Sequence, residues 1–175
     1  MVARWQCGTV GSVATVTLEG LPEGFAGTLR TLEAMRSFVL SAPRDAGLRD
    51  FALYITRDVR GHDFAAEQDR LFYFARDFVS YRRDPVDLEL VQDARRTLER
   101  RAGDCDDKVV LLASLLACLG HRSRFIIVSY SLPHFHHVYL QTLRSGQWID
   151  LDPTNERAEP GWYVPAVRRL AYAVN

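Results

Sequence analysis

Residues 102–120 of the chain read AGDCDDKVVLLASLLACLG and predict a buried helix. Gly103 suits the end of the preceding element, Asp104 is a favourable N-cap, and Gly120 suits the left-handed position that closes a helix. Within the helix, residues 109–119 form an apolar run of eleven residues that only Ser114 interrupts, well short of the roughly 20 that a membrane span requires. Because this helix is apolar on every side, we expect the rest of the fold to pack around it.

The segments before this helix are predicted to be mostly helical. Residues 10–18 read as a strand that ends at the turn-forming residues 20–24. After it, apolar residues recur at intervals of three and four, which predicts helices. The predicted helices cover residues 28–39, residues from Pro43 to about 55, and residues from the N-cap Asp63 to about 79, with Asp84-Pro85 as a stop. The arginines between 95 and 101 are expected to form an exposed helical face.

The segments after this helix are predicted to be strands. The apolar period changes from 3.6 to 2, and residues 125–130, 136–143 and 147–151 read as an antiparallel sheet. Helices followed by strands indicate an α+β fold. The chain has 175 residues and no linker-like segment, so we expect residues 1–175 to form a single domain.

The overall composition excludes several classes of protein. The 22 basic and 22 acidic residues cancel, so no global field attracts nucleic acid or an anionic membrane. The three cysteines, Cys7, Cys105 and Cys118, form no CxxC pair and are expected to be reduced. Of these, Cys118 is assigned to the core and Cys7 to no function. No targeting segment is visible, which makes a cytoplasmic location the expectation.

Cys105 is predicted to lie in the first turn of the buried helix. Unpaired backbone N–H groups and the positive end of the helix dipole favour a thiolate there, which suits a nucleophile. The neighbouring Asp104, Asp106 and Asp107 act in the opposite direction, because like charge disfavours the thiolate. A cationic partner is therefore needed, and His137 is the candidate.

The hairpin around Ser145-Gly146 brings a carboxylate to that histidine. A two-residue turn there pairs Arg144 with Gln147 and fixes the register of the two strands. The resulting opposed pairs are Tyr139 with Asp152, Gln141 with Asp150, and Leu143 with Trp148. His137 then lies diagonal to Asp152 on the same face, whereas His136 falls on the apolar face. Cysteine, histidine and an orienting acid together are the constellation of acyl-transfer enzymes.

Three other interpretations of these residues remain open. Cys105 alone is compatible with an unreactive core thiol, and the chain with a non-catalytic interaction or assembly module. The histidines at 134, 136 and 137, joined by Cys105 or Asp150, are compatible with a zinc site. Adjacent strand residues point to opposite faces, however, so His136 and His137 cannot ligate one ion without a bulge.

Three motifs resemble the transglutaminase-like superfamily, in its compact bacterial and phage-type branch. They are GDCDD at 103–107, HVYLQT at 137–142 and WIDLDPT at 148–154. The resemblance covers residues 65–157, with residues 1–64 as an elaboration.

The resemblance implies a papain-like fold and a catalytic triad. It assigns Cys105 as nucleophile, His137 as general base and acid, and Asp152 as orienting carboxylate. The family includes transglutaminases, peptide N-glycanases, proteases and amide hydrolases, which implies a protein or peptide substrate and no cofactor. Possible cleft-lining residues are Tyr81, Asp104, Trp148 and Tyr139, the last standing where the family commonly has tryptophan.

Overall fold

The computed structural model describes residues 13–85 and 89–175, and in these residues helices precede the main sheet as predicted. Cys7 and the first residues of the predicted N-terminal strand lie outside this part of the chain. The elements are β1 (Thr15–Leu18), α1 (Phe25–Ser41), the 3-10 helix η1 (Ala42–Arg44), α2 (Ala46–Ile55), α3 (Phe64–Phe78), β2 (Ser80–Tyr81), β3 (Glu89–Gln92), α4 (Ala94–Arg100), β4 (Ala102–Gly103), α5 (Cys105–Cys118), β5 (Ser123–Ser129), β6 (His137–Arg144), β7 (Gln147–Leu151) and β8 (Arg168–Ala173). The predicted α+β fold is confirmed.

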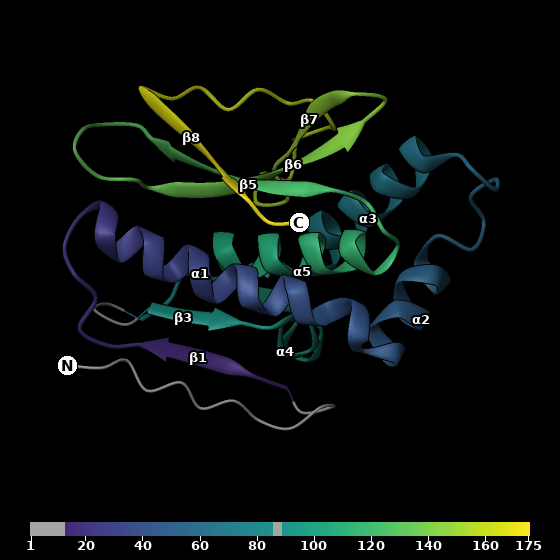
Figure 1. Ribbon diagram of the computed structural model, residues 1–175, viewed down its shortest axis with the longest axis horizontal. Coiled ribbons are helices and arrows are strands. Elements are labelled where there is room, and N and C mark those ends of the chain that lie inside the picture. Colours follow the sequence, from purple (N-terminus) through teal and green to yellow (C-terminus); the bar gives the residue numbers. More distant parts are fainter. Residues whose placement is uncertain (1–12, 86–88) are drawn as a thin grey trace.

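The helix α5 forms the centre of the core, as its all-round apolar sequence predicts. Every residue from Asp106 to Leu116 is buried. Figure 1 shows α5 between the four-stranded sheet on one side and the layer of β1, β3 and α4 on the other, with α1 alongside it. Burial of each large apolar side chain contributes about 1.5–3 kcal/mol, so this helix holds the layers together and fixes where its first residue lies.

Aspartates cap the starts of three other helices, namely Asp45 for α2, Asp63 for α3 and Asp93 for α4. The carboxylate of Asp63 accepts the backbone N–H of Ala66 at 3.0 Å, which confirms this residue as the N-cap of α3. Asp45 accepts the N–H of Leu48 at 3.1 Å and starts α2. The helix predicted from Pro43 is therefore divided into the 3-10 helix η1 and α2, because the cap lies two residues after the proline.

The main sheet is antiparallel, with the strand order β7-β6-β5-β8. The predicted hairpin register is confirmed by the pairs Gln141 with Asp150 and Leu143 with Trp148, among others. Both turn residues have positive φ, 48° at Ser145 and 83° at Gly146, as a two-residue hairpin loop requires. The pair of Leu140 with Leu151 is the one farthest from the turn, so the predicted pair of Tyr139 with Asp152 lies just beyond the end of the ladder.

Four short strands, β2, β3, β4 and β8, were not predicted. β8 adds an edge strand beside β5, β2 pairs in parallel with β4, and β3 pairs with β1, which lies within the strand predicted at residues 10–18. The arginine-rich segment forms α4, but Arg95 is not simply solvated because its guanidinium binds the Asp45 carboxylate. None of the helices in residues 13–85 and 89–175 is long and apolar enough to span a membrane.

Candidate active site

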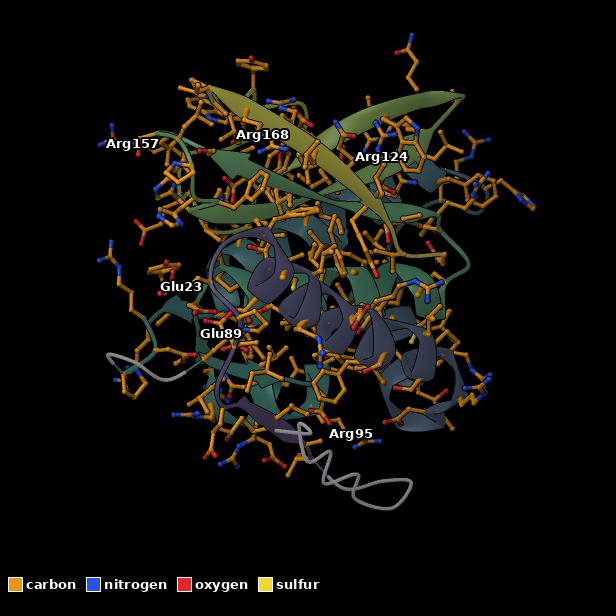
Figure 2. All side chains as sticks on the ribbon, turned by 60° about the vertical axis from the view of Figure 1, so that its left-hand side comes forward. Glu23, Glu89, Arg95, Arg124, Arg157 and Arg168 are labelled. Atoms are coloured by element: carbon orange, nitrogen blue, oxygen red, sulfur yellow. The ribbon has the colours of Figure 1, made fainter. Side chains whose placement is uncertain are left out.

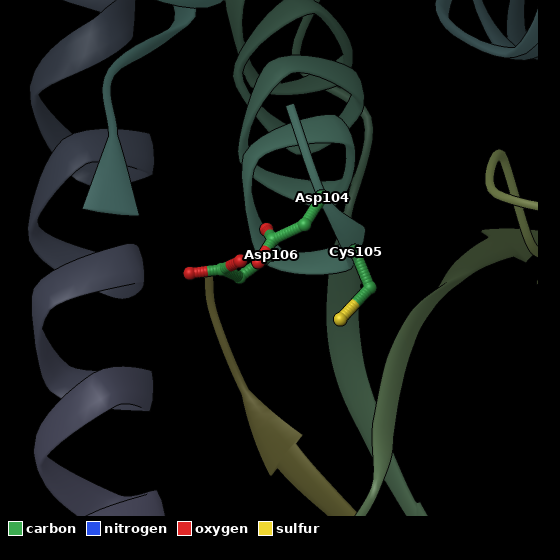
Figure 3. A group of neighbouring side chains, drawn as sticks. All are labelled: Asp104, Cys105 and Asp106. Atoms are coloured by element: carbon green, nitrogen blue, oxygen red, sulfur yellow. The ribbon is translucent and has the colours of Figure 1, made fainter. Parts of the chain in front are cut away.

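Cys105 is the first residue of α5, as predicted. Asp104 precedes it as the N-cap, and the backbone N–H of Asp104 donates to the carboxylate of Asp107 at 3.4 Å. In the other direction, the Asp104 side chain faces the backbone N–H of Asp107, and this capping box fixes the first turn of the helix. The Cys105 side chain is partly buried and extends from the helix start toward a neighbouring strand (Figure 3).

Cys105 lies near β6. The backbone N–H of Val138 is close enough to the sulfur to favour the thiolate and so to lower the pKa of the thiol. Val138 directly follows His137 in the sequence, so the packing of α5 on β6 brings the sulfur to the strand that carries the histidine. The core thus connects two residues that are 32 positions apart in the chain.

His137 and Asp152 form the second half of the candidate site. The Nε2 atom of His137 is 2.9 Å from the Oδ2 atom of Asp152, and both side chains are largely buried. Because a carboxylate only accepts hydrogen bonds, Nε2 carries the proton. In the neutral ring the Nδ1 atom is then unprotonated and is the atom able to act as a base. The diagonal contact predicted from the hairpin register is present.

Thr154 holds the other oxygen of the same carboxylate. Its hydroxyl donates to Oδ1 of Asp152 at 2.6 Å, and its backbone N–H donates to the same oxygen at 3.0 Å. Burial alone would raise the pKa of Asp152, but the contacts with His137 and Thr154 outweigh it and hold the pKa below its usual range. The carboxylate is therefore ionised and fixed in orientation.

Burial dominates the electrostatics of Cys105. It raises the pKa of the thiol well above its usual value, and the carboxyl groups of Asp106 and Asp104 raise it further when they are ionised. Glu89, labelled in Figure 2, adds a smaller contribution of the same sign. The effect of the flanking aspartates expected from the sequence is present, and together with burial it favours the neutral thiol in the resting protein. Reaction therefore requires a base that takes the proton as the sulfur attacks.

Two of these aspartates form a close carboxyl pair. Oxygen atoms of Asp104 and Asp106 and the sulfur of Cys105 all lie within 4.8 Å of one another (Figure 3). Asp106 is 4% exposed, and one oxygen of each carboxyl has no hydrogen-bond donor in the described chain. Burial, followed by the contact with Asp104, raises the pKa of Asp106 well above its usual value. If Asp106 retains its proton, its carboxyl group donates a hydrogen bond to the Asp104 carboxylate, and both buried groups then have a hydrogen-bond partner.

We expect Asp106→Asn to stabilise the protein more at pH 8 than at pH 5. The unfolded chain releases the Asp106 proton near its ordinary pKa of about 4, whereas the folded protein retains it. The wild-type protein therefore loses stability as the pH rises above that value. Asparagine cannot ionise and can still donate to Asp104, so we expect a gain of about 1–3 kcal/mol at pH 8. Urea unfolding at both pH values measures it.

The matched control for this experiment is Asp50→Asn, since Asp50 is an exposed aspartate on α2. Its effect on stability should be nearly independent of pH. A variant at position 106 that is less stable than the wild type at pH 8 would show that the ionised carboxylate is required.

The four possible cleft residues lie in different places. Asp104 adjoins Cys105, and Tyr81 pairs with Gly103 through the β2–β4 bridge, two residues before the cysteine. Tyr81 is 48% exposed. Burial raises the pKa of its phenol, and the charges of Cys105 and Asp104 add to this shift. These two residues therefore border the candidate nucleophile.

The other two lie away from the sulfur. Tyr139 is fully buried in a separate apolar cluster with Ile126, Val128 and Val164, and its ring lies behind that of His137 with centroids 6.2 Å apart. Trp148 pairs with Leu143, six residues along β6 from the histidine, which corresponds to roughly 20 Å at 3.3 Å per residue. Tyr139 thus packs on the ring of His137, whereas Trp148 lies far from the candidate site.

Tyr130 borders the site and was not found from the sequence. It is 50% exposed and follows the end of β5. Burial raises the pKa of its phenol, and Asp152 and Cys105 raise it further, which places the ring near both groups. The imidazole of His136 stacks on it at 6.0 Å and accepts the Tyr130 backbone N–H. No sequence signal marks this tyrosine, because its position depends on the loop between β5 and β6.

The expected alternative of a histidine-based metal site is not formed. In residues 13–85 and 89–175, the one group of three potential ligands close together consists of Asp104, Cys105 and Asp106, without a histidine. His136 is engaged with the loop, as described. Asp150, interpreted from the sequence as solvated, is buried and accepts a hydrogen bond from the Gln141 amide at 2.5 Å.

Comparison with known families agrees with this geometry. Residues 50–153, more than half of the chain, match the sequence pattern of the transglutaminase-like superfamily. The chain belongs to this superfamily. The match contains the predicted nucleophile, histidine and aspartate positions, and it begins earlier than residue 65, within α2. No curated protein matches the chain.

Solved structures of this superfamily fold show the same architecture at low sequence identity. A candidate protease from Parabacteroides distasonis has a TM-score of 0.53 and 14% identity, over 69% of this chain and 26% of that one. A candidate cysteine protease from Cytophaga hutchinsonii has a TM-score of 0.50 and 17% identity, over 71% and 49%. This superfamily member therefore spans about a quarter to a half of the length of those proteins.

Proposed function

We propose that this protein is a cysteine-dependent enzyme that acts on an amide group of a protein or peptide substrate. Cys105 is the nucleophile, His137 the general base and acid, and Asp152 the residue that orients the histidine. The proposal rests mainly on the hydrogen bond between His137 and Asp152, with His137 on β6, the strand on which α5 packs. Membership of the transglutaminase-like superfamily supports the same reaction class.

In the proposed reaction, the sulfur of Cys105 attacks the amide carbonyl carbon while Nδ1 of His137 takes the thiol proton. The tetrahedral intermediate collapses, the C–N bond breaks, and His137 returns this proton to the departing amine. The remaining thioester reacts with water to give an acid, or with a second amine to give a new amide. Either product restores the thiol, and no cofactor is required.

The first turn of α5 offers a donor for the oxyanion. The backbone N–H of Cys105 is one of the first groups of the helix and has no partner within it. A negative oxygen that forms on the carbonyl beside the sulfur is stabilised by this group and by the helix dipole. The same helix start that positions the nucleophile thus supports its transition state.

Alkylation with iodoacetamide tests the proposed pairing of Cys105 and His137. We expect Cys105 to react at pH 7 at least about tenfold more slowly in His137→Ala than in the wild type, because the base is lost. Mass spectrometry identifies the labelled cysteine, and Cys105→Ala provides the blank. A matched control is His134→Ala, since His134 is exposed in the loop between β5 and β6, three residues before His137.

A non-catalytic interaction module is the second candidate function. The raised pKa of the buried Cys105 thiol favours it, because a neutral thiol is a poor nucleophile. This candidate predicts that Cys105 reacts more slowly than a free thiol at every pH and that His137→Ala leaves the rate unchanged. That result would contradict the proposed enzyme.

A further inference from the structure

A pocket lies at the end of α5 that is far from Cys105. It has a volume of about 410 Å³ and lies between the residues that follow α5, the start of α3 and the β6–β7 hairpin. Figure 1 shows α3 and this hairpin at the same end of the molecule. The 14 residues of α5, at 1.5 Å each, separate this pocket from Cys105 by about 20 Å. It is therefore distinct from the candidate active site.

The floor of this pocket is a rigid polar network. The Nε2 atom of His121 lies 3.0 Å from the Glu67 carboxylate, and its Nδ1 atom lies 3.3 Å from the Gln68 amide nitrogen. That amide also donates to the carbonyl of Leu143, and its oxygen accepts from Arg144. His121 and Gln68 are 8% and 2% exposed. Buried polar groups bonded on every side form a preorganised surface.

One wall of the pocket is an exposed aromatic ring. Phe64 is 57% exposed at the start of α3. The rings of His62 and His121 meet it edge to face, with centroids 6.1 and 6.0 Å away. His62 has a φ of 66°, a conformation that costs a residue with a side chain about 1–2 kcal/mol. The exposed ring of Phe64 can stack on a planar ligand. The strained backbone at His62 is of the kind found at ligand-binding sites.

The rim of the pocket has one guanidinium outside the ion pairs of the described chain, that of Arg122. Arg144 and the Asp63 carboxylate, which caps α3, also line the rim, and the Glu67 carboxylate is engaged with His121 in the floor. Arg144 is held in place by the Asp69 carboxylate as well as by Gln68. Arg122 is exposed and forms no ion pair with any residue of the described chain. A fixed and a free guanidinium beside an aromatic ring can bind an anion attached to a planar group.

We propose that this pocket binds a small planar anion, namely an aromatic or heteroaromatic ring that carries a phosphate or a carboxylate. The ring packs against Phe64 and the anionic group binds Arg122, with the floor around His121 fixing the depth of the pocket. The volume is within the range of about 300–1,000 Å³ that small-molecule sites occupy. This inference does not depend on the activity of Cys105.

Isothermal titration calorimetry with four probes tests this site on the whole protein. The probes are adenosine monophosphate and benzoate, which combine a ring with an anion, and adenosine and inorganic phosphate, which supply only one of the two. We expect at least one combined probe to bind at least about tenfold more tightly than either single-feature probe. Binding of adenosine monophosphate indicates a nucleotide as the source of the ligand, and binding of benzoate alone indicates an aromatic carboxylate.

Two variants locate the binding, and each has a matched control. Arg122→Gln and Phe64→Leu are each expected to weaken the combined probe about tenfold. Arg30→Gln and Tyr54→Leu change an exposed arginine and an exposed aromatic residue on other helices, α1 and α2, and should leave binding unchanged. The proposal is overturned if no combined probe binds better than its parts, or if either pocket variant binds like the wild type.

Discussion

Asp152→Asn is expected to reduce the proposed activity roughly 100-fold or more, although the substitution changes only one atom of the side chain. Thr154 donates both its hydroxyl and its backbone N–H to Oδ1 of Asp152. In the variant, these donors require the amide oxygen at that position. The amide nitrogen must then face Nε2 of His137, which can accept this contact only by giving up its proton. The proton moves to Nδ1, and the histidine can no longer act as a base in its neutral form.

Thr154→Val separates this mechanism from a simple loss of charge. In the wild-type background, the valine removes one donor to the carboxylate and should lower activity about 3- to 10-fold. In the Asp152→Asn background, it removes one of the two donors that impose the unfavourable amide orientation, so we expect activity to rise about threefold or more. Thr154→Ser keeps the hydroxyl and provides the matched control in both backgrounds.

The rate of iodoacetamide labelling at Cys105 between pH 5 and 9 gives the readout without requiring a known substrate. The Asp152→Asn protein should show the slow reaction of His137→Ala. If the valine lowers the rate equally in both backgrounds, Thr154 acts only on local stability and the tautomer argument is wrong.

The histidine and aspartate half of the site could be predicted because it is encoded locally. Ser145-Gly146 demands a two-residue turn, and the turn fixes every pair along β6 and β7. From that register, His137 and Asp152 follow as diagonal neighbours. The start of α5 could also be predicted, since the N-cap Asp104 precedes a helix that is almost wholly apolar from Val109 onward.

The remaining features depend on contacts between distant segments. Tyr130 reaches the site through the loop after β5, and Tyr139 packs behind His137 in its own apolar cluster. The strand β8 has the sequence RRLAYA, in which no alternation marks the buried face, and it forms because β5 offers an open edge. Elements of two residues, such as β2 and β4, carry too few side chains to show a period.

Cys105→Ala is expected to reduce turnover of an amide substrate to background, a loss of at least about 1000-fold, because no thioester can form. Two assays cover the two products: release of fluorescent peptides from labelled casein for hydrolysis, and incorporation of a dansylated amine into casein for transamidation. Cys118→Ala is the matched control. Its sulfur lies at the opposite end of α5 and donates to the carbonyl of Ala42 at 3.4 Å, so activity should be retained.

The raised pKa of the Cys105 thiol makes Cys105→Ser a second and sharper variant. If activity depended only on a group able to donate a proton to His137, serine would retain part of it. Serine ionises far less readily than cysteine, and the surrounding Asp104 and Asp106 disfavour its alkoxide as well. We therefore expect Cys105→Ser to be as inactive as Cys105→Ala in both assays. Turnover by Cys105→Ala close to that of the wild type would show that the reaction proceeds without a thioester and would exclude Cys105 as the nucleophile.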